Sequence, residues 1–511
     1  MRHSEQPRHR RVRFSGAILA RFSASSPAPI PHMLNDDPIG FQDQSRLPRR
    51  LAPNAFAGVW LPARPQAGLN DAKALPVAGV ATGFGTMNDP SHVTIGERHG
   101  WGDPRPFGIS SEDQRQHVYV IGKTGSGKTT LLRNMILQHM ALGHGVGLID
   151  PHGDLAEELL HHIPPHRADH LVYFNPGDVE FPVGLNLLAN VAPDDRHLVA
   201  SGIVAAFKGI WWDSWGPRLE YILYNAVSAL LDCRDATLLG VNRLLVDPKF
   251  RARVIRQIKD PFIRSFWADE FEGYDERFKR EAIAPIQNKL GQFLLNPVVR
   301  NILGQVKTKV DIPFVMDEGR LFIANLSKGR LGHDKANLLG SLLTTQFQLA
   351  AMARSTIPED DRRDFYLFID EFQNFSTDSF ASILAEARKY RLCLVLSHQY
   401  IDQLALPIRQ AVFGNVGTLI SFRIGHTDAE IMEREFGRAI PASELADLNR
   451  NEAAVKLLDS GANATPFRAA MLPPMENQVG EWENLIPLSR DRFATPRAVI
   501  EAKLGRWMKS P

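Results

Sequence analysis

Residues 117–130 read HVYVIGKTGSGKTT and contain GxxxxGKT at 122–129, the complete pattern of a phosphate-binding loop. The residues before the glycines are apolar and partly β-branched, which predicts a buried strand. Apolar residues recur at helical spacing from Leu131 to Met140, which predicts a helix directly after the loop. A strand, a glycine loop and a helix in this order form the setting in which the pattern binds a nucleotide. The alternative, a glycine-rich turn with an incidental lysine, does not explain these flanks.

Each part of this loop has an expected role. Glycines allow backbone N–H groups to curl around phosphate oxygens, and the positive end of the following helix points at the same place. Lys128 is expected to reach the β- and γ-phosphates, and the hydroxyl of Thr129 is expected to ligate Mg²⁺. The predicted cofactors are therefore ATP and Mg²⁺. The residues expected to hold the nucleotide are Gly122, Lys123, Thr124, Gly125, Ser126, Gly127, Lys128, Thr129 and Thr130.

The composition, with 44% hydrophobic and 23% charged residues, is that of an ordinary soluble globular protein. A chain of 511 residues is too long for one core, so two or three domains are expected. The net charge of +2 provides no global basic field, so any DNA-binding surface must be local. Cys233 and Cys393 lack metal-ligand spacing, which indicates a reducing compartment and no zinc site.

No apolar run approaches the ~20 residues that cross a bilayer. We therefore expect a cytoplasmic protein without an integral membrane span.

The domain organisation follows from changes of pattern along the chain. Residues 1–85 are rich in Pro, Arg, Ala and Ser and are expected to be irregular. In 86–192 and again in 306–475, strand-like runs alternate with helical runs, which predicts an α/β nucleotide-binding core with a parallel sheet. Between them, 193–305 is mostly helical and predicts an inserted all-helical subdomain, with its aromatic residues in its own core. Residues 476–511 are expected to form an extension, extended at first and helical at its end.

A second motif, FYLFIDE at 365–371, is an apolar run that ends in two acids. Buried strands tolerate acids at their ends, where the acids are paired, solvated or metal-bound. Asp370 is expected to contact Mg²⁺ indirectly, through water or through another ligand of the ion. Glu371 is expected to polarise the water that attacks the γ-phosphate. Because many strands end in acids, this pattern becomes specific only together with the phosphate-binding loop.

Two further polar residues are candidates for catalysis. The strand-like run 392–396 is followed by Gln399, whose amide is expected to sense the γ-phosphate or orient the water; the alternative is an ordinary loop amide. Arg388 precedes that run. If subunits form a ring, it can act as an arginine finger in a neighbour's site, an effect of about 10³–10⁵ in rate. The alternative is a surface arginine, and Arg423 is a second candidate.

Together these motifs resemble the conjugative DNA-transfer coupling ATPases of type IV secretion, within the HerA–FtsK superfamily of P-loop motors. The resemblance covers roughly residues 95 to 505. It rests on seven segments in this order: Ile121–Thr129, Asp150–Asp154, Trp215–Arg218, Leu326–Gly329, Ile369–Gln373, Ala387–Lys389 and Gln399.

The resemblance implies a RecA-like motor core with an inserted all-helical domain, working as a hexameric ring around DNA. It implies non-specific DNA and further copies of the chain as partners, with a relaxase or other secretion-system proteins as candidates. It also implies that the arginine before the sensor glutamine acts in trans, and Arg388 stands eleven residues before Gln399. Coupling proteins usually begin with membrane-spanning helices. This sequence shows none, so we expect a relative without a membrane anchor.

Two function hypotheses remain open at this stage. The first is an ATP-hydrolysing motor that moves DNA. Lys328 and Arg330, which follow a strand-like run, either contact DNA phosphates in it or lie on its outer surface. The second is a nucleotide-gated adaptor that recruits a protein or nucleoprotein substrate to a secretion or transfer complex. A GTPase is disfavoured, because the nearest match to the guanine-reading motif, Asn288–Gly291, lacks its acid.

Overall fold

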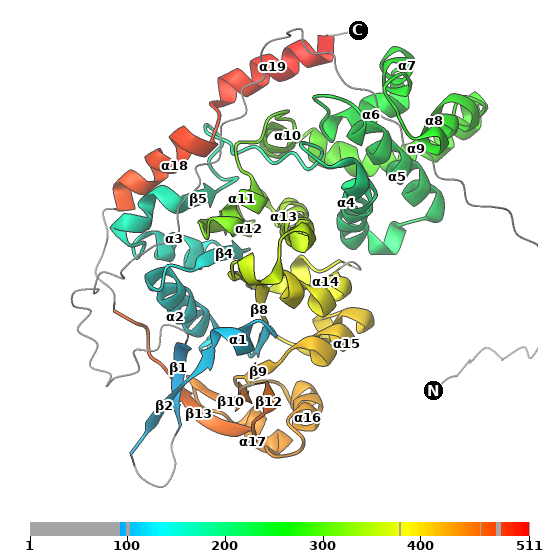
Figure 1. Cartoon of the computed structure of the whole chain (residues 1–511). Helices are drawn as coiled ribbons and strands as arrows, with labels where there is room; N and C mark the ends of the chain where they lie inside the picture. The colour runs from blue at the N-terminus through cyan, green and yellow to red at the C-terminus, as the bar shows by residue number, and fades with distance from the viewer. Residues whose placement is uncertain (1–91, 99–102, 378–379, 460, 477–481, 510–511) are drawn as a thin grey trace, which may run out of the picture. The chain divides into compact units, whose positions relative to one another are not determined.

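The computed structural model describes residues 92–98, 103–377, 380–459, 461–476 and 482–509 (Figure 1). The N-terminal segment 1–85, expected to be irregular, lies outside the described residues. Within the described part of the chain, no helix is both long enough and apolar enough to span a membrane.

An eleven-stranded sheet forms the centre of the fold, in the order β2-β1-β13-β10-β9-β3-β8-β7-β4-β6-β5. The seven strands from β9 to β5 are parallel, and the four from β2 to β10 pair antiparallel. The predicted α/β class with a largely parallel sheet is confirmed. The strands are β1 (His92–Arg98), β2 (Arg105–Ser110), β3 (Val118–Ile121), β4 (Gly145–Asp150), β5 (Leu171–Phe174), β6 (Leu321–Asn325), β7 (Phe365–Ile369), β8 (Leu392–His398), β9 (Thr418–Ser421), β10 (Glu452–Lys456) and β13 (Phe467–Met471), with β11 (Leu458–Asp459) and β12 (Ala462–Asn463) as a separate small hairpin.

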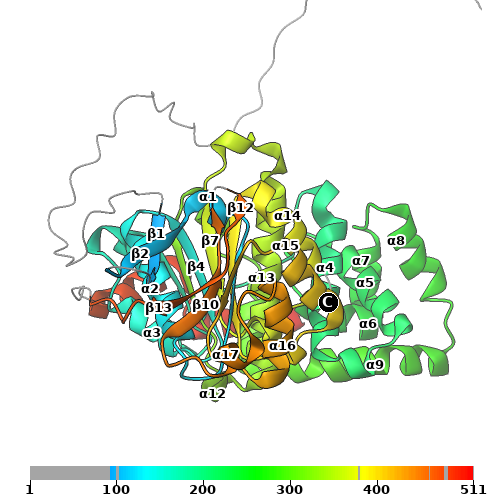
Figure 2. The ribbon, with the colours of Figure 1, turned by 90° about the horizontal axis from the view of Figure 1, so that it is seen from below.

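Helices cover both faces of the parallel part of this sheet (Figure 2). In β3, Val118 and Val120 pack toward α2 and α3, whereas Tyr119 and Ile121 pack toward α13 and α14. Because both faces are buried, the strands read as continuous apolar runs rather than alternating ones. The helices around the sheet are α1 (Ser111–Gln114), α2 (Lys128–Ala141), α3 (Asp154–Leu160), α11 (Ile312–Asp317), α12 (Lys328–Leu331), α13 (His333–Ala353), α14 (Phe380–Glu386), α15 (Leu406–Asn415), α16 (His426–Glu435) and α17 (Ala442–Ala446).

Seven helices between β5 and β6 form a helical insert, which packs on the core where α4 contacts α13 (Figure 1). Trp267 and Phe271 are fully buried inside it, and the Trp267 indole N–H donates to the backbone oxygen of Asn225 at 3.1 Å. These aromatics form the core of the insert, as predicted, although Trp212 is exposed. The helices are α4 (Arg196–Ile210), α5 (Pro217–Leu231), α6 (Leu239–Val246), α7 (Pro248–Ile255), α8 (Pro261–Ser265), α9 (Glu276–Leu294) and α10 (Pro297–Leu303).

The C-terminal extension contains two helices, α18 (Leu485–Phe493) and α19 (Arg497–Lys509), rather than one. The expectation of an extended segment before the last helix was therefore wrong over α18. This helix is stabilised by packing against β5, where the Ser489 hydroxyl accepts a hydrogen bond from the Tyr173 backbone N–H at 3.0 Å. Tertiary contact decided its conformation, and its local pattern alone did not predict it.

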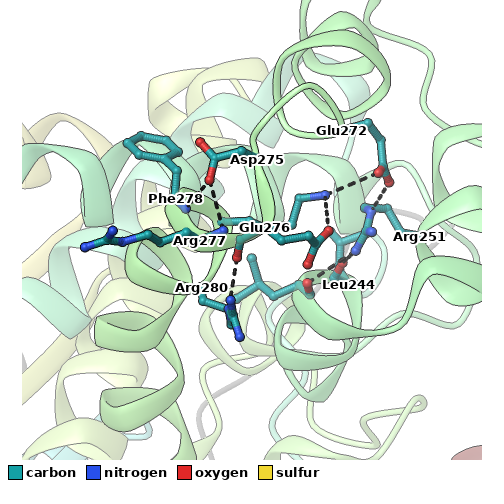
Figure 3. Close-up of polar contacts among 10 residues, drawn as sticks. Leu244, Arg251, Glu272, Asp275, Glu276, Arg277, Phe278 and Arg280 are labelled. Carbon is teal, nitrogen blue, oxygen red and sulfur yellow. Dashed lines mark hydrogen bonds and ion pairs between the residues drawn. The ribbon is translucent and has the colours of Figure 1, made fainter.

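A buried arginine joins two helices and a turn of the insert (Figure 3). The side chain of Arg251, only 4% exposed, donates from Nη1 to the backbone oxygens of Leu244 and Leu245 at 2.9 and 3.2 Å and pairs through Nε with Glu272. Lys279 lies 3.5 Å from the same carboxylate. Because the guanidinium satisfies carbonyls that water does not reach, it fixes the relative positions of α6, α7 and the turn at Glu272 that precedes α9.

Replacing Arg251 with alanine should lower the free energy of unfolding by about 2 kcal/mol, because two carbonyls and a carboxylate lose their donor. The measurement is urea denaturation followed by tryptophan fluorescence. The matched control is Arg277→Ala, since the Arg277–Glu281 pair at 3.2 Å is exposed and is expected to contribute less than about 0.5 kcal/mol. Equal destabilisation by the two variants would contradict this role of Arg251.

Candidate nucleotide site

The carboxyl ends of four neighbouring parallel strands meet at one edge of the sheet. Ile121 at the end of β3 is in register with His398 of β8, and Ile369 at the end of β7 is in register with Leu396 of β8 and Ile149 of β4. The segments that follow these strands therefore converge, as they do in open α/β sheets that bind ligands at this edge. They carry the phosphate-binding loop, Gln399, the two acids after β7 and Asp150.

The loop between β3 and α2 has a backbone that requires glycine at two positions. Gly125 and Gly127 have φ of +75° and +126°, values that side chains with a Cβ rarely adopt. A Cβ on Gly127 would also lie 2.8 Å from Oδ1 of Asn451 and from the ring of Phe422. The loop then leads into α2, whose first N–H groups are not used within the helix. The cradle and the helix start together provide donors for an anionic group.

Lys128 is the first residue of α2 and is only 6% exposed. Its Nζ donates to the backbone oxygen of Gly122, and also to that of Lys123 at 3.3 Å. Burial lowers the pKa of Lys128, whereas the carboxylates of Glu371 and Asp370 act in the opposite direction. The ammonium is thus enclosed by its own loop and faces the two acids, the position predicted from the sequence.

Asp370 and Glu371 follow β7 and are 7% and 6% exposed. Burial, together with the nearby charges of Asp150 and Glu371, raises the pKa of Asp370 to about 6. Glu371 has φ of +48°, a left-handed conformation that costs free energy for a residue other than glycine and is characteristic of functional sites. The two acids are held in a confined, strained arrangement beside the amine of Lys128.

The carboxylate of Glu371 is held from two sides. Gln399 donates from Nε2 to Oε1 at 2.8 Å, and Gln373 donates from Nε2 to Oε2 at 2.8 Å. The structure therefore brings Gln399 directly to Glu371. No role was predicted for Gln373 from the sequence, although its place two residues after Glu371 was a usable signal.

These groups line one pocket of about 330 Å³. Its wall includes Thr129 and Asp370, the two predicted Mg²⁺ ligands, and it also includes three residues that the sequence analysis did not assign to the site. The pocket is lined by Thr124, Gly125, Gly127, Lys128, Thr129, Thr130, His152, Asp370, Glu371, Gln399, Arg450 and Asn451. His152 belongs to the segment Asp150–Asp154, one of the seven on which the family resemblance rests. Arg450 and Asn451 come from the distant turn before β10, and no sequence pattern connected them with the site. Asn451 joins the loop by donating its backbone N–H to the Ser126 oxygen at 3.0 Å.

Lys328 also faces the carboxylates of this site. Its backbone N–H donates to the Pro151 oxygen at 3.0 Å, which holds the start of α12 against the turn after β4. Burial lowers the pKa of Lys328, and Glu371 and Asp370 act to raise it. Arg330, the other cation considered for DNA contact, lies 3.3 Å from Glu157 in an exposed ion pair. The two residues therefore lie in different surroundings, and Lys328 belongs to the nucleotide side.

Arg388 is not in the pocket. It lies in the 3₁₀ turn Ala387–Tyr390 before β8, whereas Gln399 follows the last residue of β8. Seven residues of strand at ~3.3 Å each separate the two edges of the sheet by roughly 20 Å. The charge of Arg388 acts instead on His117, at the start of β3. Arg423 lies nearer to the loop, because its backbone oxygen accepts from the Lys123 N–H at 2.9 Å.

Two family models match the parts of the chain that build this site. Residues 104–195 match the model described as the central domain of the helicase HerA. Residues 318–460 match the model of the DNA-binding domain of type IV secretion-system coupling proteins. The resemblance predicted from the sequence is confirmed. A search among curated proteins finds no significant match.

Solved structures of coupling and secretion ATPases share the fold. The bacterial conjugative coupling protein TrwB, lacking its first 70 residues, is 17% identical, with a TM-score of 0.53 over 72% of this chain and 87% of that one. TrwB in complex with ADP and Mg²⁺ is 17% identical, with a TM-score of 0.52 over 73% and 88%. VirB4 of Thermoanaerobacter pseudethanolicus is 13% identical, with a TM-score of 0.52 over 78% and 100%. At these identities the likeness establishes a common RecA-type fold.

Replacing Asp370 with asparagine should stabilise the nucleotide-free protein at pH 7.5 by about 2–3 kcal/mol. A carboxyl with a raised pKa of about 6 holds its proton more tightly in the folded chain than in the unfolded chain, so stability falls as the pH rises from 4 to 6. The carboxamide removes that penalty. Thermal unfolding between pH 4 and 7.5 should show a higher unfolding temperature for Asp370→Asn than for the unchanged chain, and the difference should shrink toward pH 4.

The exposed Asp361→Asn is the control and should leave the unfolding temperature unchanged. An Asp370→Asn protein that is less stable than the unchanged chain at pH 7.5 would contradict the claim that the Asp370 carboxylate destabilises the nucleotide-free protein.

Proposed function

We propose that this chain is an ATP-hydrolysing ring motor that translocates DNA, of the conjugative coupling type. The observation that carries the proposal is the direct hydrogen bond from Gln399 to Glu371 in the pocket that also contains Lys128. A phosphate-binding loop, a base and a sensor amide are the parts that a P-loop NTPase needs for hydrolysis. The match of residues 318–460 to a coupling-protein DNA-binding domain supports DNA as the substrate.

The residues present fit a nucleotide with Mg²⁺. At Gly125 the cradle is open, because nothing lies within 4 Å of the position that a Cβ would take, and Thr129 and Asp370 line the same pocket. Hydroxyl and carboxylate oxygens suit Mg²⁺, which keeps several waters and shares the phosphates as ligands. When bound, Mg²⁺ would neutralise charge on the β- and γ-phosphates. TrwB has been crystallised with ADP and Mg²⁺, and with an ATP analogue that is not hydrolysed.

In the proposed reaction Glu371 takes a proton from the attacking water as the water forms a bond to the γ-phosphorus. The bond between that phosphorus and the bridging oxygen breaks, and ADP leaves with the electron pair. Gln399 and Gln373 hold both oxygens of Glu371, so the carboxylate keeps one orientation toward the water. Lys128, and Lys328 behind it, offset the negative charge that gathers at the phosphates.

The position of Arg388 supports a ring. It lies at the opposite edge of the sheet from its own pocket, so it reaches a nucleotide only if that nucleotide belongs to a neighbouring copy. We propose a hexamer in which each Arg388 completes the next subunit's site. Hydrolysis would then change how neighbours pack and move the segments that contact DNA phosphates. The proposed contact is non-specific, so DNA affinity should fall steeply with salt.

A second candidate function is a nucleotide-gated adaptor that recruits a protein or nucleoprotein substrate. Three large apolar side chains on the helical insert favour it: Trp212, Phe262 and Leu295 are 78%, 83% and 76% exposed. Exposed apolar groups of this size are suited to a protein contact. A relaxase or another secretion-system protein is the partner class that the family likeness suggests. The two candidates differ in whether turnover is required.

Lys128→Ala and Glu371→Gln should each reduce ATP hydrolysis at least about 100-fold, by different routes. Lys128→Ala removes the cation at the phosphates and should weaken ATP binding. Glu371→Gln keeps the shape of the side chain and should bind ATP with little change. Phosphate release with and without DNA measures the first effect, and titration with a fluorescent ATP analogue measures the second. A DNA transfer function that survives Glu371→Gln but not Lys128→Ala would favour the adaptor.

Arg388→Ala should bind ATP normally but lose hydrolysis about 1,000-fold, if the residue completes a neighbour's site. Mixing Arg388→Ala protein with Glu371→Gln protein should restore part of the activity, because some interfaces then combine an intact finger with an intact base. Arg391→Ala, three residues along the same edge, is the control and should keep its activity. Normal turnover by Arg388→Ala would remove the finger.

A further inference from the structure

A buried aromatic cluster lies beneath the nucleotide site and joins three of its segments. Tyr119 stands three residues before Gly122, the first residue of the phosphate-binding loop; Phe372 directly follows Glu371, and His398 directly precedes Gln399. All three side chains are fully buried. None of them lines the nucleotide pocket. The cluster is therefore placed to act on the site from behind and not on the nucleotide itself.

The three rings contact one another at defined angles. The Tyr119 hydroxyl and Nε2 of His398 share a hydrogen bond. The ring of Phe372 stands nearly perpendicular to both, with centroids 6.4 Å from Tyr119 and 5.1 Å from His398. Edge-to-face contacts of this kind are directional, unlike ordinary apolar packing. A rotation of any one ring would therefore displace the other two.

The backbone repeats the same connection. The Gly122 N–H donates to the backbone oxygen of His398 at 3.3 Å, which ties the start of the phosphate-binding loop to the residue before Gln399. On the other side, Glu371 adopts its left-handed conformation directly before Phe372. Such a conformation persists only where the surroundings hold it. The ring of Phe372, wedged against Tyr119 and His398, provides that constraint.

Stability alone does not require this hydrogen bond. Burial lowers the pKa of His398 to about 3 and raises that of Tyr119 well above 10, so both groups are neutral at physiological pH. Tyr119 belongs to the main hydrophobic core, and His398 has the Gln403 side chain and the Tyr400 backbone as further polar neighbours. Two apolar side chains of similar shape would stabilise such a core about as well as a neutral hydrogen-bonded pair. What the pair adds is a fixed orientation of the two rings.

We propose that Tyr119, His398 and Phe372 form a positioning cluster that sets Glu371 and Gln399 at the correct place behind the phosphate-binding loop. This inference rests on the proposed ATPase function and assigns a role to three residues that do not touch the nucleotide. Tyr119 fixes the position of the phosphate-binding loop, and His398 fixes that of Gln399. Phe372 contacts both rings and so fixes Glu371 relative to them. The cluster thus determines kcat and has little effect on nucleotide affinity.

The test is a kinetic comparison of Tyr119→Phe, His398→Leu and the double variant with the unchanged chain. Tyr119→Phe removes one hydroxyl from a buried position. The expected result is a kcat reduced about tenfold or more, with affinity for a non-hydrolysable ATP analogue changed less than about twofold. Because both single changes break the same hydrogen bond, their effects on kcat should not add in the double variant.

The control is Tyr366→Phe, a change at an equally buried tyrosine of β7 that stacks on His139 at 3.7 Å on the other face of the sheet. It should retain kcat. If Tyr119→Phe and Tyr366→Phe lose kcat equally, and in proportion to a lowered unfolding temperature, the cluster contributes only to stability and has no positioning role. If Tyr119→Phe does not fold, the double variant, which leaves no unpaired polar atom at that contact, provides the same readout.

The outcomes separate the two claims. An unchanged chain that hydrolyses ATP, together with a folded Tyr119→Phe protein of equal kcat, overturns the positioning cluster and leaves the proposed function intact. An unchanged chain without turnover, with or without DNA, overturns both.

Discussion

A buried amine beside buried carboxylates is the constraint on which the site depends. Lys128 is enclosed by the carbonyls of its own loop, while Asp370 and Glu371 stand opposite in a region that water hardly reaches. Burial raises the pKa of Asp370, and repulsion from the neighbouring acids acts in the same direction. An arrangement of this kind is unfavourable without its ligand, and a nucleotide with its cation would relieve it. The charges stay together because they follow strands that are paired side by side in one sheet.

That pairing is the work of the parallel sheet. Strands β3, β8, β7 and β4 are adjacent and in register, so four loops from separate parts of the chain end within one pocket. The helices on both faces bury the strands and prevent the register from slipping. The helical insert contributes no residue to this pocket and is joined to the core through α4 and α13. It is therefore free to carry a different task, such as contact with a partner.

The two edges of the sheet have different chemistry. The carboxyl edge carries the nucleotide pocket, and the opposite edge carries Arg388 near the start of β3 and β8. Strands of roughly 20 Å keep these groups apart within one chain. In the ring that we propose, the edge of one subunit that carries Arg388 would meet the edge of the next subunit that carries the nucleotide pocket. One subunit would then act on the site of its neighbour.

The amino-acid sequence by itself determined the elements whose signals are local. A short apolar run in the sequence predicts each strand end that carries a site residue: the loop at 122–129 after β3, the acids after β7 and Gln399 after β8. The class of the sheet followed from the alternation of these strands with helices. Only the tertiary structure decided which distant residues join them. Asn451 and Arg450 enter the pocket from a turn more than 300 residues beyond the loop, and α18 forms where β5 offers a surface. The reason is physical: strand and loop propensities act over a few neighbours, whereas contacts between distant segments depend on strand order and packing, which no single stretch encodes.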